Sequence, residues 1–213
     1  MVKKPTLKGQ NTPLIYDFPI YSRLKALFLA QLPAALPLLC SASIRKNDPT
    51  SMHVQFITTG GTIDKIYFDA LSQFEVGDSQ IKAMLTDALV DFSYEVTAIM
   101  KKDSLDITDE DRATIRAHIE ASEHSHFIVT HGTDTMPETA AALRGIENKT
   151  VVLTGALTPA RFRTTDAVFN IGMAVGTVQT AAPGVYIAMS GQLFEAGQVR
   201  KNREANRFES AFD

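Results

Sequence analysis

The residues of this sequence that are best suited to chemistry lie in two short segments rich in glycine and threonine. The first is Thr59-Gly60-Gly61-Thr62 and the second is His131-Gly132-Thr133-Asp134-Thr135. A threonine hydroxyl becomes a nucleophile only when a base, or a lysine of lowered pKa, takes its proton. A carboxylate beside it, such as that of Asp134, can hold a cationic group. The segments therefore indicate a site where a hydroxyl attacks a bound ligand or delivers water to it.

Each segment also has a simpler structural interpretation. The paired glycines of the first segment fit a tight turn, and neither the G-x-G-x-x-G nor the G-K-[ST] pattern of a phosphate-binding loop is present. In the second segment, Thr135 precedes an apolar period and Glu138 follows three residues later, which is the spacing of a helix capping box. We expect Thr135 to cap a helix, which leaves Thr133 and Asp134 in the loop.

Both segments directly follow predicted strands. Short runs rich in valine, isoleucine and phenylalanine predict five strands, at Val54–Thr58, Tyr94–Met100, His126–Thr130, Thr150–Thr154 and Val185–Ser190. Helical periods between them predict helices at Ile81–Val90, Thr108–Ser122, Met136–Ile146 and Asp166–Gln179. This alternation predicts a single α/β domain with a doubly wound, Rossmann- or flavodoxin-like, mostly parallel sheet. Ligands of such sheets bind beyond the carboxyl ends of the strands, where both segments lie.

The composition excludes several classes of protein. The chain has 213 residues, 45% of them hydrophobic and 21% charged, which is typical of a globular domain. Its net charge of −3 offers no broad attraction for nucleic acid. A single cysteine, Cys40, excludes an intrachain disulfide framework, and the five histidines show no zinc-ligand spacing with cysteine. We expect neither a metal nor a cofactor.

Residues 1–51 differ in composition from the remainder. They contain seven Lys/Arg, two Asp/Glu and six of the nine prolines, and the remaining chain has fourteen basic and twenty-two acidic residues. We expect 1–51 to be an extension outside the core, with Met52 as the functional start of a domain over 52–213. The alternative is an export signal, because Ala26–Cys40 is apolar, although it is interrupted by prolines and too short to span a membrane. The expected location is accordingly cytoplasmic, or exported under the alternative.

Several segments together carry a family resemblance. Ile57–Ile63 and Thr130–Met136 resemble the two signature segments of the bacterial-type asparaginase/glutaminase family. The similarity continues through Val151–Ala156, Asp166 with Phe169-Asn170, and Val199–Asn202, in order and over essentially all of 54–210. Members of that family hydrolyse the side-chain amide of asparagine, and some that of glutamine, without a metal or an organic cofactor. The resemblance implies the same reaction here.

The resemblance also implies roles for individual residues. The primary nucleophile corresponds to Thr62, and the second hydroxyl with its partners to Thr133, Asp134 and Lys201. For substrate binding, it implies that Asp134 binds the α-ammonium and Ser104 the α-carboxylate, with Gly61 and Ala156 in the surrounding loops. We expect backbone N–H groups of the Gly61–Thr62 turn to meet the negative charge that develops on the amide oxygen.

Three departures from the family pattern qualify this expectation. Phe74 aligns with the family's catalytic tyrosine, so Tyr67 in the same loop is the candidate substitute, or else a packed aromatic. Leu105 stands where a polar, substrate-contacting residue is common. Members of the family have a second, C-terminal domain that supplies an acidic residue across a subunit interface. We expect this chain to be either a naturally short, one-domain member or a truncated one, in which Glu195 or Glu204 of a neighbouring subunit compensates for that acid. We expect a homodimer or larger assembly, because a catalytic loop open to solvent would gain from a neighbour that covers it. Two further functions remain open: an amino-acid-binding protein without turnover, and an ammonia-supplying amidotransferase subunit.

Overall fold

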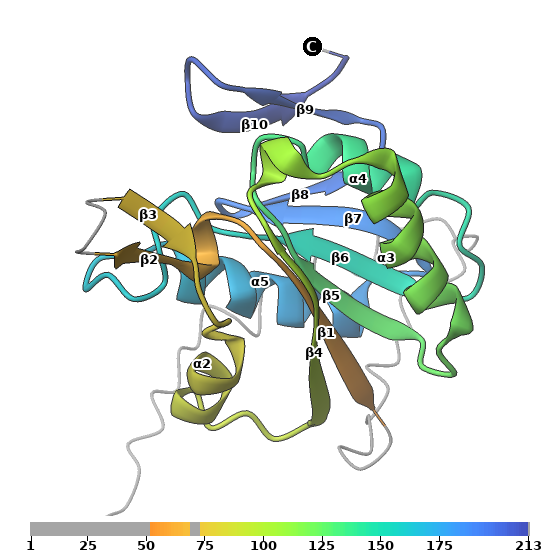
Figure 1. Cartoon of the computed structure of the whole chain (residues 1–213). Helices are drawn as coiled ribbons and strands as arrows, with labels where there is room; N and C mark the ends of the chain where they lie inside the picture. Colours follow the sequence, from red (N-terminus) through yellow and green to blue (C-terminus); the bar gives the residue numbers. More distant parts are fainter. Residues whose placement is uncertain (1–51, 69–72, 213) are drawn as a thin grey trace, which may run out of the picture. The chain divides into compact units, whose positions relative to one another are not determined.

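A six-stranded sheet lies at the centre of the computed structural model, which describes residues 52–68 and 73–212 (Figure 1). The strand order is β4-β1-β5-β6-β7-β8, and all neighbouring strands are parallel except the antiparallel pair β7–β8. The strands are β1 (His53–Gly60), β4 (Ser93–Lys102), β5 (His126–Thr130), β6 (Thr150–Thr154), β7 (Gly184–Met189) and β8 (Gln192–Glu195). The predicted fold class, a doubly wound and mostly parallel α/β sheet, is confirmed.

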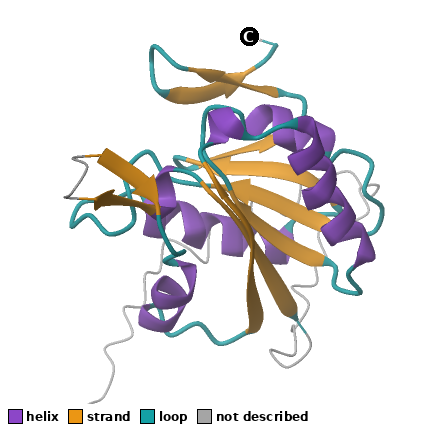
Figure 2. Ribbon diagram, in the orientation of Figure 1, coloured by secondary structure: helices purple, strands orange, loops and turns teal. Residues whose placement is uncertain are grey.

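Helices cover both faces of this sheet (Figure 2). The helices α3 (Asp109–Ala121) and α4 (Met136–Ala142) share one apolar cluster with Ile57, Phe127 and Val129. The helices α2 (Ile81–Asp87) and α5 (Ala167–Thr180) share a second cluster with Val54, Phe56 and Ile128. Consecutive strand residues thus alternate between two cores, as the pleat requires. This explains why central strands such as β5 and β6 read as nearly continuous apolar runs.

Two hairpins stand outside the sheet and were not predicted. They are β2 (Lys65–Phe68) with β3 (Gln73–Val76), and β9 (Val199–Asn202) with β10 (Arg207–Ser210). The β9 strand, with the sequence VRKN, lacks an apolar run because only one of its residues is buried. All five predicted strands and four predicted helices are present, although α2 and α4 end earlier than expected. The extension expected at 1–51 lies outside the described residues.

No helix within 52–68 and 73–212 combines the length and the hydropathy that a membrane-spanning segment needs.

Candidate active site

The two glycine-containing segments touch each other at the carboxyl edge of the sheet. Gly61 has φ +85°, and a methyl group added to it would lie 2.4 Å from both the nitrogen and the Cα of Gly132. Only glycine permits this approach, because any side chain would enter the neighbouring backbone. Thr62 directly follows one of these glycines and Thr133 follows the other. The contact therefore brings together the two loops that carry the predicted hydroxyls.

A third loop packs against the same point. Ser104 begins the short 3₁₀ helix η3 (Ser104–Asp106) after β4, and its side chain is buried. A methyl group on Gly132 would lie 2.6 Å from the Cβ of Ser104. The Gly61 N–H donates to the carbonyl of Lys102, two residues before Ser104, at 2.9 Å. The loops after β1, β4 and β5 thus form one packed cluster.

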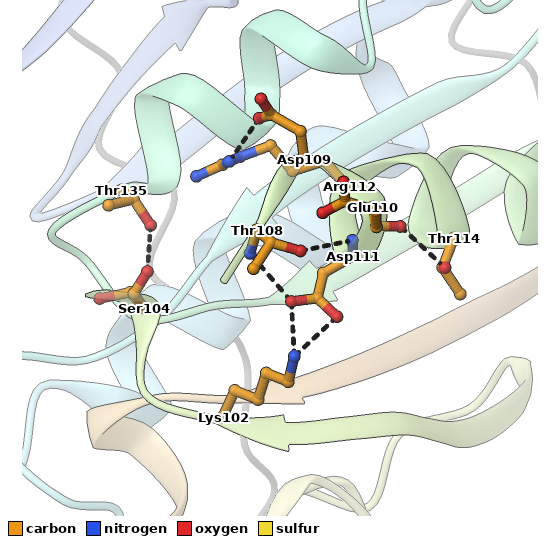
Figure 3. A network of polar contacts seen from close by, with 9 residues as sticks. All are labelled: Lys102, Ser104, Thr108, Asp109, Glu110, Asp111, Arg112, Thr114 and Thr135. Atoms are coloured by element: carbon orange, nitrogen blue, oxygen red, sulfur yellow. Dashed lines mark hydrogen bonds and ion pairs between the residues drawn. The ribbon is translucent and has the colours of Figure 1, made fainter. Parts of the chain in front are cut away.

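The Ser104 loop is held by the start of α3 (Figure 3). Thr108 and Asp111 form a reciprocal capping box, which agrees with the helix start predicted at Thr108. The Lys102 ammonium donates to both carboxylate oxygens of Asp111, at 2.7 and 2.9 Å. These bonds hold the lysine whose carbonyl accepts the Gly61 N–H, and they connect the helix cap to the glycine turn.

Thr135 does not form the capping box expected for it. The residue occupies the N-cap position of α4, but its side chain makes no capping hydrogen bond. Its hydroxyl instead donates to the Ser104 carbonyl at 2.6 Å (Figure 3). The prediction of helix position was right and that of the bond was wrong, because a carbonyl from a loop distant in sequence competes for the hydroxyl. Thr135 therefore contributes another link between the two loops.

His131 is a structural residue of the second loop. Its imidazole is buried, with Nδ1 2.7 Å from the Gly132 carbonyl and Nε2 2.8 Å from the Thr139 hydroxyl. The Thr139 oxygen also accepts from Arg112 Nε at 3.2 Å. Since a carbonyl only accepts, Nδ1 carries the proton and Nε2 accepts from Thr139. Burial lowers the pKa of His131 to about 4, so the ring is neutral at physiological pH.

The neutral state of His131 predicts a pH-dependent stability. An unfolded histidine has a pKa near 6.5, so between pH 6.5 and about 4 the unfolded chain binds a proton that the folded chain does not. The stabilisation is fully present above pH 6.5 and decreases as pH falls towards 4, by about 3 kcal/mol in total. Urea unfolding at pH 7 and 4.5 should show a smaller pH effect in His131→Asn than in the wild type.

The matched control for this experiment is His126→Asn. His126 is only half-buried, and its Nδ1 lies 3.0 Å from the exposed hydroxyl of Ser125. The pH dependence of the free energy of unfolding should therefore change less in this variant than in His131→Asn. Equal pH dependence in the wild type and His131→Asn would contradict the assignment of a neutral buried imidazole.

The loop after β6 completes the edge of the site. Asp166 accepts from the backbone N–H groups of Leu157 and Thr158, and from the side-chain amide of Asn170. Asn170 in turn donates to the Gly155 carbonyl and accepts from the Ser190 N–H. Asp166 and Asn170, which the family resemblance singled out, therefore make the hydrogen bonds that shape this loop.

Ala156, expected near the substrate, has its side chain in the apolar cluster of α2 and α5. A methyl group on the preceding Gly155 would lie 2.3 Å from the His131 carbonyl oxygen. Any contribution of Ala156 to binding is accordingly restricted to its backbone.

Asp134 and Lys201 line a pocket of about 780 Å³, together with residues of α4, of the β9–β10 hairpin and of the loop before that hairpin. The Lys201 ammonium lies 3.0 Å from the Asn206 side-chain oxygen and 5.0 Å from the centre of the Phe208 ring. The pKa of Lys201 lies below its usual value, because the effect of partial burial outweighs the opposing effect of the negative charges of Asp134 and Asp166. Arg203, which was not predicted, lies with Nε 3.8 Å from the Asp134 carboxylate.

The aromatic candidates lie on the β2–β3 hairpin. Tyr67 and Phe74 are directly opposite each other in its antiparallel register. Their side chains are outside the described structure, so the role expected for Tyr67 stays a prediction. The hairpin itself is tied to the Ser104 loop, because Lys65 pairs with Asp103 at 2.7 Å. Sequence reasoning missed this pair, since no motif joins the two residues.

Comparison with known proteins gives a family match and several relatives. The family model "Asparaginase, N-terminal" matches residues 53–212. An L-asparaginase of Thermococcus kodakarensis is 37% identical over 112 residues, which are 50% of this chain and 34% of that protein. The solved structure of the thermostable L-asparaginase from the same organism matches with a TM-score of 0.66 at 28% identity, over 75% of this chain and 51% of that one.

Two further relatives have names that indicate a periplasmic location in one case and an amidotransferase in the other. A probable periplasmic L-asparaginase of Haemophilus influenzae is 30% identical over 161 residues, which are 70% of this chain and 46% of that protein. A glutamyl-tRNA(Gln) amidotransferase subunit from Methanococcus vannielii is 37% identical over 90 residues, which are 38% of this chain and 21% of that protein. The chain thus spans about half or less of the length of these relatives.

Proposed function

This chain belongs to the asparaginase family through its N-terminal domain, and on that basis we propose that it hydrolyses the side-chain amide of L-asparagine or of a related small amide. The products are the corresponding acid and ammonia. The observation that carries the proposal is the contact between Gly61 and Gly132, which joins the loops bearing Thr62 and Thr133. Because the chain spans about half or less of its asparaginase relatives, activity of this chain by itself is part of the proposal.

In the proposed reaction Thr62 is the nucleophile. Its Oγ forms a bond to the amide carbon while its proton passes to a neighbouring base. The carbon–nitrogen bond then breaks, the nitrogen takes a proton and ammonia leaves. Water attacks the resulting ester with assistance from Thr133, which releases the acid and restores the Thr62 hydroxyl. The Asp134–Lys201 pair is the proposed proton relay.

The environment of Lys201 supports its role in that relay. Partial burial lowers its pKa, which favours the neutral amine that can accept a proton. The Lys201 ammonium donates a hydrogen bond to the side-chain oxygen of Asn206. The ion-pair partner of Asp134 among the described residues is Arg203, whose Nε lies 3.8 Å from the carboxylate. Asp134 is therefore available, in this proposal, for the α-ammonium of the substrate as well.

The structure leaves fewer N–H groups for the proposed oxyanion site than the sequence suggested. The Gly61 N–H already donates to the Lys102 carbonyl, so it is not free to bind a developing negative charge. Of the two N–H groups in the Gly61–Thr62 turn, that of Thr62 is the remaining candidate. The proposed role of Gly61 is then steric, because it lets the two loops approach.

A second candidate function is the supply of ammonia within an amidotransferase, which the similarity to the amidotransferase protein from Methanococcus vannielii favours. It requires a partner enzyme that consumes the ammonia. The third candidate is an amino-acid-binding protein that retains the pocket but does not hydrolyse the ligand. We further propose that the chain forms a homodimer or larger assembly and that it is cytoplasmic. A mass in solution equal to that of one chain would contradict the proposed assembly.

The direct test is ammonia release by the full chain from asparagine and from glutamine. Asparagine and glutamine differ by one methylene, which a pocket distinguishes by only about 1–3 kcal/mol, so both substrates are needed. The proposal is supported if the wild type releases ammonia and the Thr133→Ala variant does not. A rise in Tm with asparagine but no ammonia would identify a binding protein instead. Ammonia release that increases only with a co-purifying partner would favour the amidotransferase function.

The role of Tyr67 can be separated from that of Phe74 by exchanging one hydroxyl. If Tyr67 substitutes for the family tyrosine, Tyr67→Phe should lower kcat for asparagine by about 10²-fold or more. Phe74→Tyr is the matched variant, since it adds a hydroxyl at the opposite register position, and it should restore part of the activity of Tyr67→Phe. Steady-state ammonia release measures both. Unchanged kcat in Tyr67→Phe would show that Tyr67 is a packing residue.

A further inference from the structure

Three side chains suited to bind a metal ion meet at the opposite edge of the sheet, where the parallel strands begin. His53 is the first residue of β1, Glu95 lies near the start of β4, and His124 lies in the loop between α3 and β5. Each offers one donor atom, and these atoms all lie within 4.8 Å of one another. Cysteine-based spacing could not reveal them, because they are separated by 42 and 29 positions in the sequence.

The sheet topology accounts for this meeting. β1 lies between β4 and β5, so three adjacent strands begin at the same edge (Figure 1). His53 pairs with Ser93 in the register, and Gln55 pairs with Glu95. Since alternate residues share a face of the sheet, His53 and Glu95 lie on the same face. The His124 ring stacks on that of His53 with a centroid separation of 4.0 Å.

The His53 imidazole is held with one nitrogen unused. Its Nδ1 lies 2.8 Å from the Ser93 hydroxyl. Its Nε2 is buried and has no hydrogen-bond partner among the described residues. When Nδ1 donates to Ser93, Nε2 carries a lone pair, which is the form in which histidine binds metals. A buried nitrogen without a partner costs free energy that a bound ion would recover.

We propose that His53, Glu95 and His124 form a binding site for Zn²⁺. Two imidazoles and one carboxylate are a ligand set that zinc uses in proteins, with water in the fourth position. Donors around tetrahedral zinc lie about 3.3 Å apart, given metal–ligand distances near 2.0–2.2 Å. Small side-chain rotations are therefore enough to close the three donors around an ion. The site lies at the edge of the sheet opposite Thr62, so the ion would cross-link β1, β4 and the α3–β5 loop.

Calorimetric titration of the full chain with ZnCl₂ tests this site, using protein without a histidine tag. We expect one ion per chain and a rise in Tm with zinc, because the ion binds only the folded state. Glu95→Gln and His124→Ala should each weaken binding at least about tenfold. Glu95 is exposed and His124 lies in the loop between α3 and β5, so both variants should fold, and circular dichroism checks that they do.

His126→Ala is the matched control. His126 lies at the same edge of the sheet and is half-buried, but its Nδ1 is bonded to Ser125 and it is not among the three donors. It should bind zinc as the wild type does, whereas Ser93→Ala should bind more weakly because the His53 tautomer is no longer held. Absence of both the heat of binding and the rise in Tm would overturn the proposal. An equal loss of affinity in His126→Ala and His124→Ala would also overturn it.

Discussion

Replacement of Thr62 by alanine should lower kcat for asparagine by about 10³-fold or more. The substitution removes the oxygen that forms the covalent bond to the amide carbon. The hydroxyl of Thr59 cannot replace it, because that group is buried and donates to the Thr130 carbonyl at 2.8 Å. The fold should persist, because Thr62 is only partly buried and its side chain caps neither end of η1 (Thr62–Asp64). Ammonia release measures the effect, with Tm as the check on folding.

Two variants make this result specific. Thr62→Ser keeps the hydroxyl and should retain a large part of the activity. Thr86→Ala deletes an exposed hydroxyl on α2 that donates to the Lys82 carbonyl of its own helix, so it should leave kcat unchanged. Equal turnover in Thr62→Ala and the wild type would exclude Thr62 as the nucleophile and would leave Thr133 to be tested in its place.

Replacement of Gly61 by alanine should strongly destabilise the fold. The added methyl group would lie 2.4 Å from two backbone atoms of Gly132, and the residue has φ +85°. Backbone atoms of a packed loop cannot move aside as a flexible side chain can, so the two loops must separate. We expect the free energy of unfolding to fall by about 2–4 kcal/mol and Tm by roughly 5–15 °C.

Gly145→Ala is the control that separates backbone conformation from steric contact. Gly145 has φ +80°, close to that of Gly61, but nothing among the described residues lies within 4 Å of an added methyl group. Only the conformational penalty remains, about 1 kcal/mol. The difference in Tm between the two variants therefore measures the contact between the loops. Equal destabilisation would show that Gly61 is needed for its φ angle alone.

The parallel strands of the sheet and the four α-helices were predictable from sequence, because burial leaves apolar runs and helical periods. The antiparallel edge strand β8 was not predicted, because its side chains are mostly exposed. The predicted strands His126–Thr130 and Thr150–Thr154 agree with β5 and β6 residue for residue. The short hairpins leave no such pattern. Their strands have four residues each and include polar side chains, so only pairing with a neighbour defines them. Lys201 lies on one of these hairpins, and its position was accordingly beyond prediction from periodicity.

The candidate site was likewise predictable from the sequence only in part. The sequence alone determined the order of the parallel strands and the α-helices along the chain, the resemblance to the family, and the placement of Thr62 and Thr133 after the strands that carry them. Only the tertiary structure decided which groups meet: Gly61 with Gly132, Thr135 with Ser104, and His53 with His124 and Glu95. Local patterns record how each residue is buried, because burial selects residue type. Contacts between distant loops depend on strand order and register, and no single segment of the sequence contains that information.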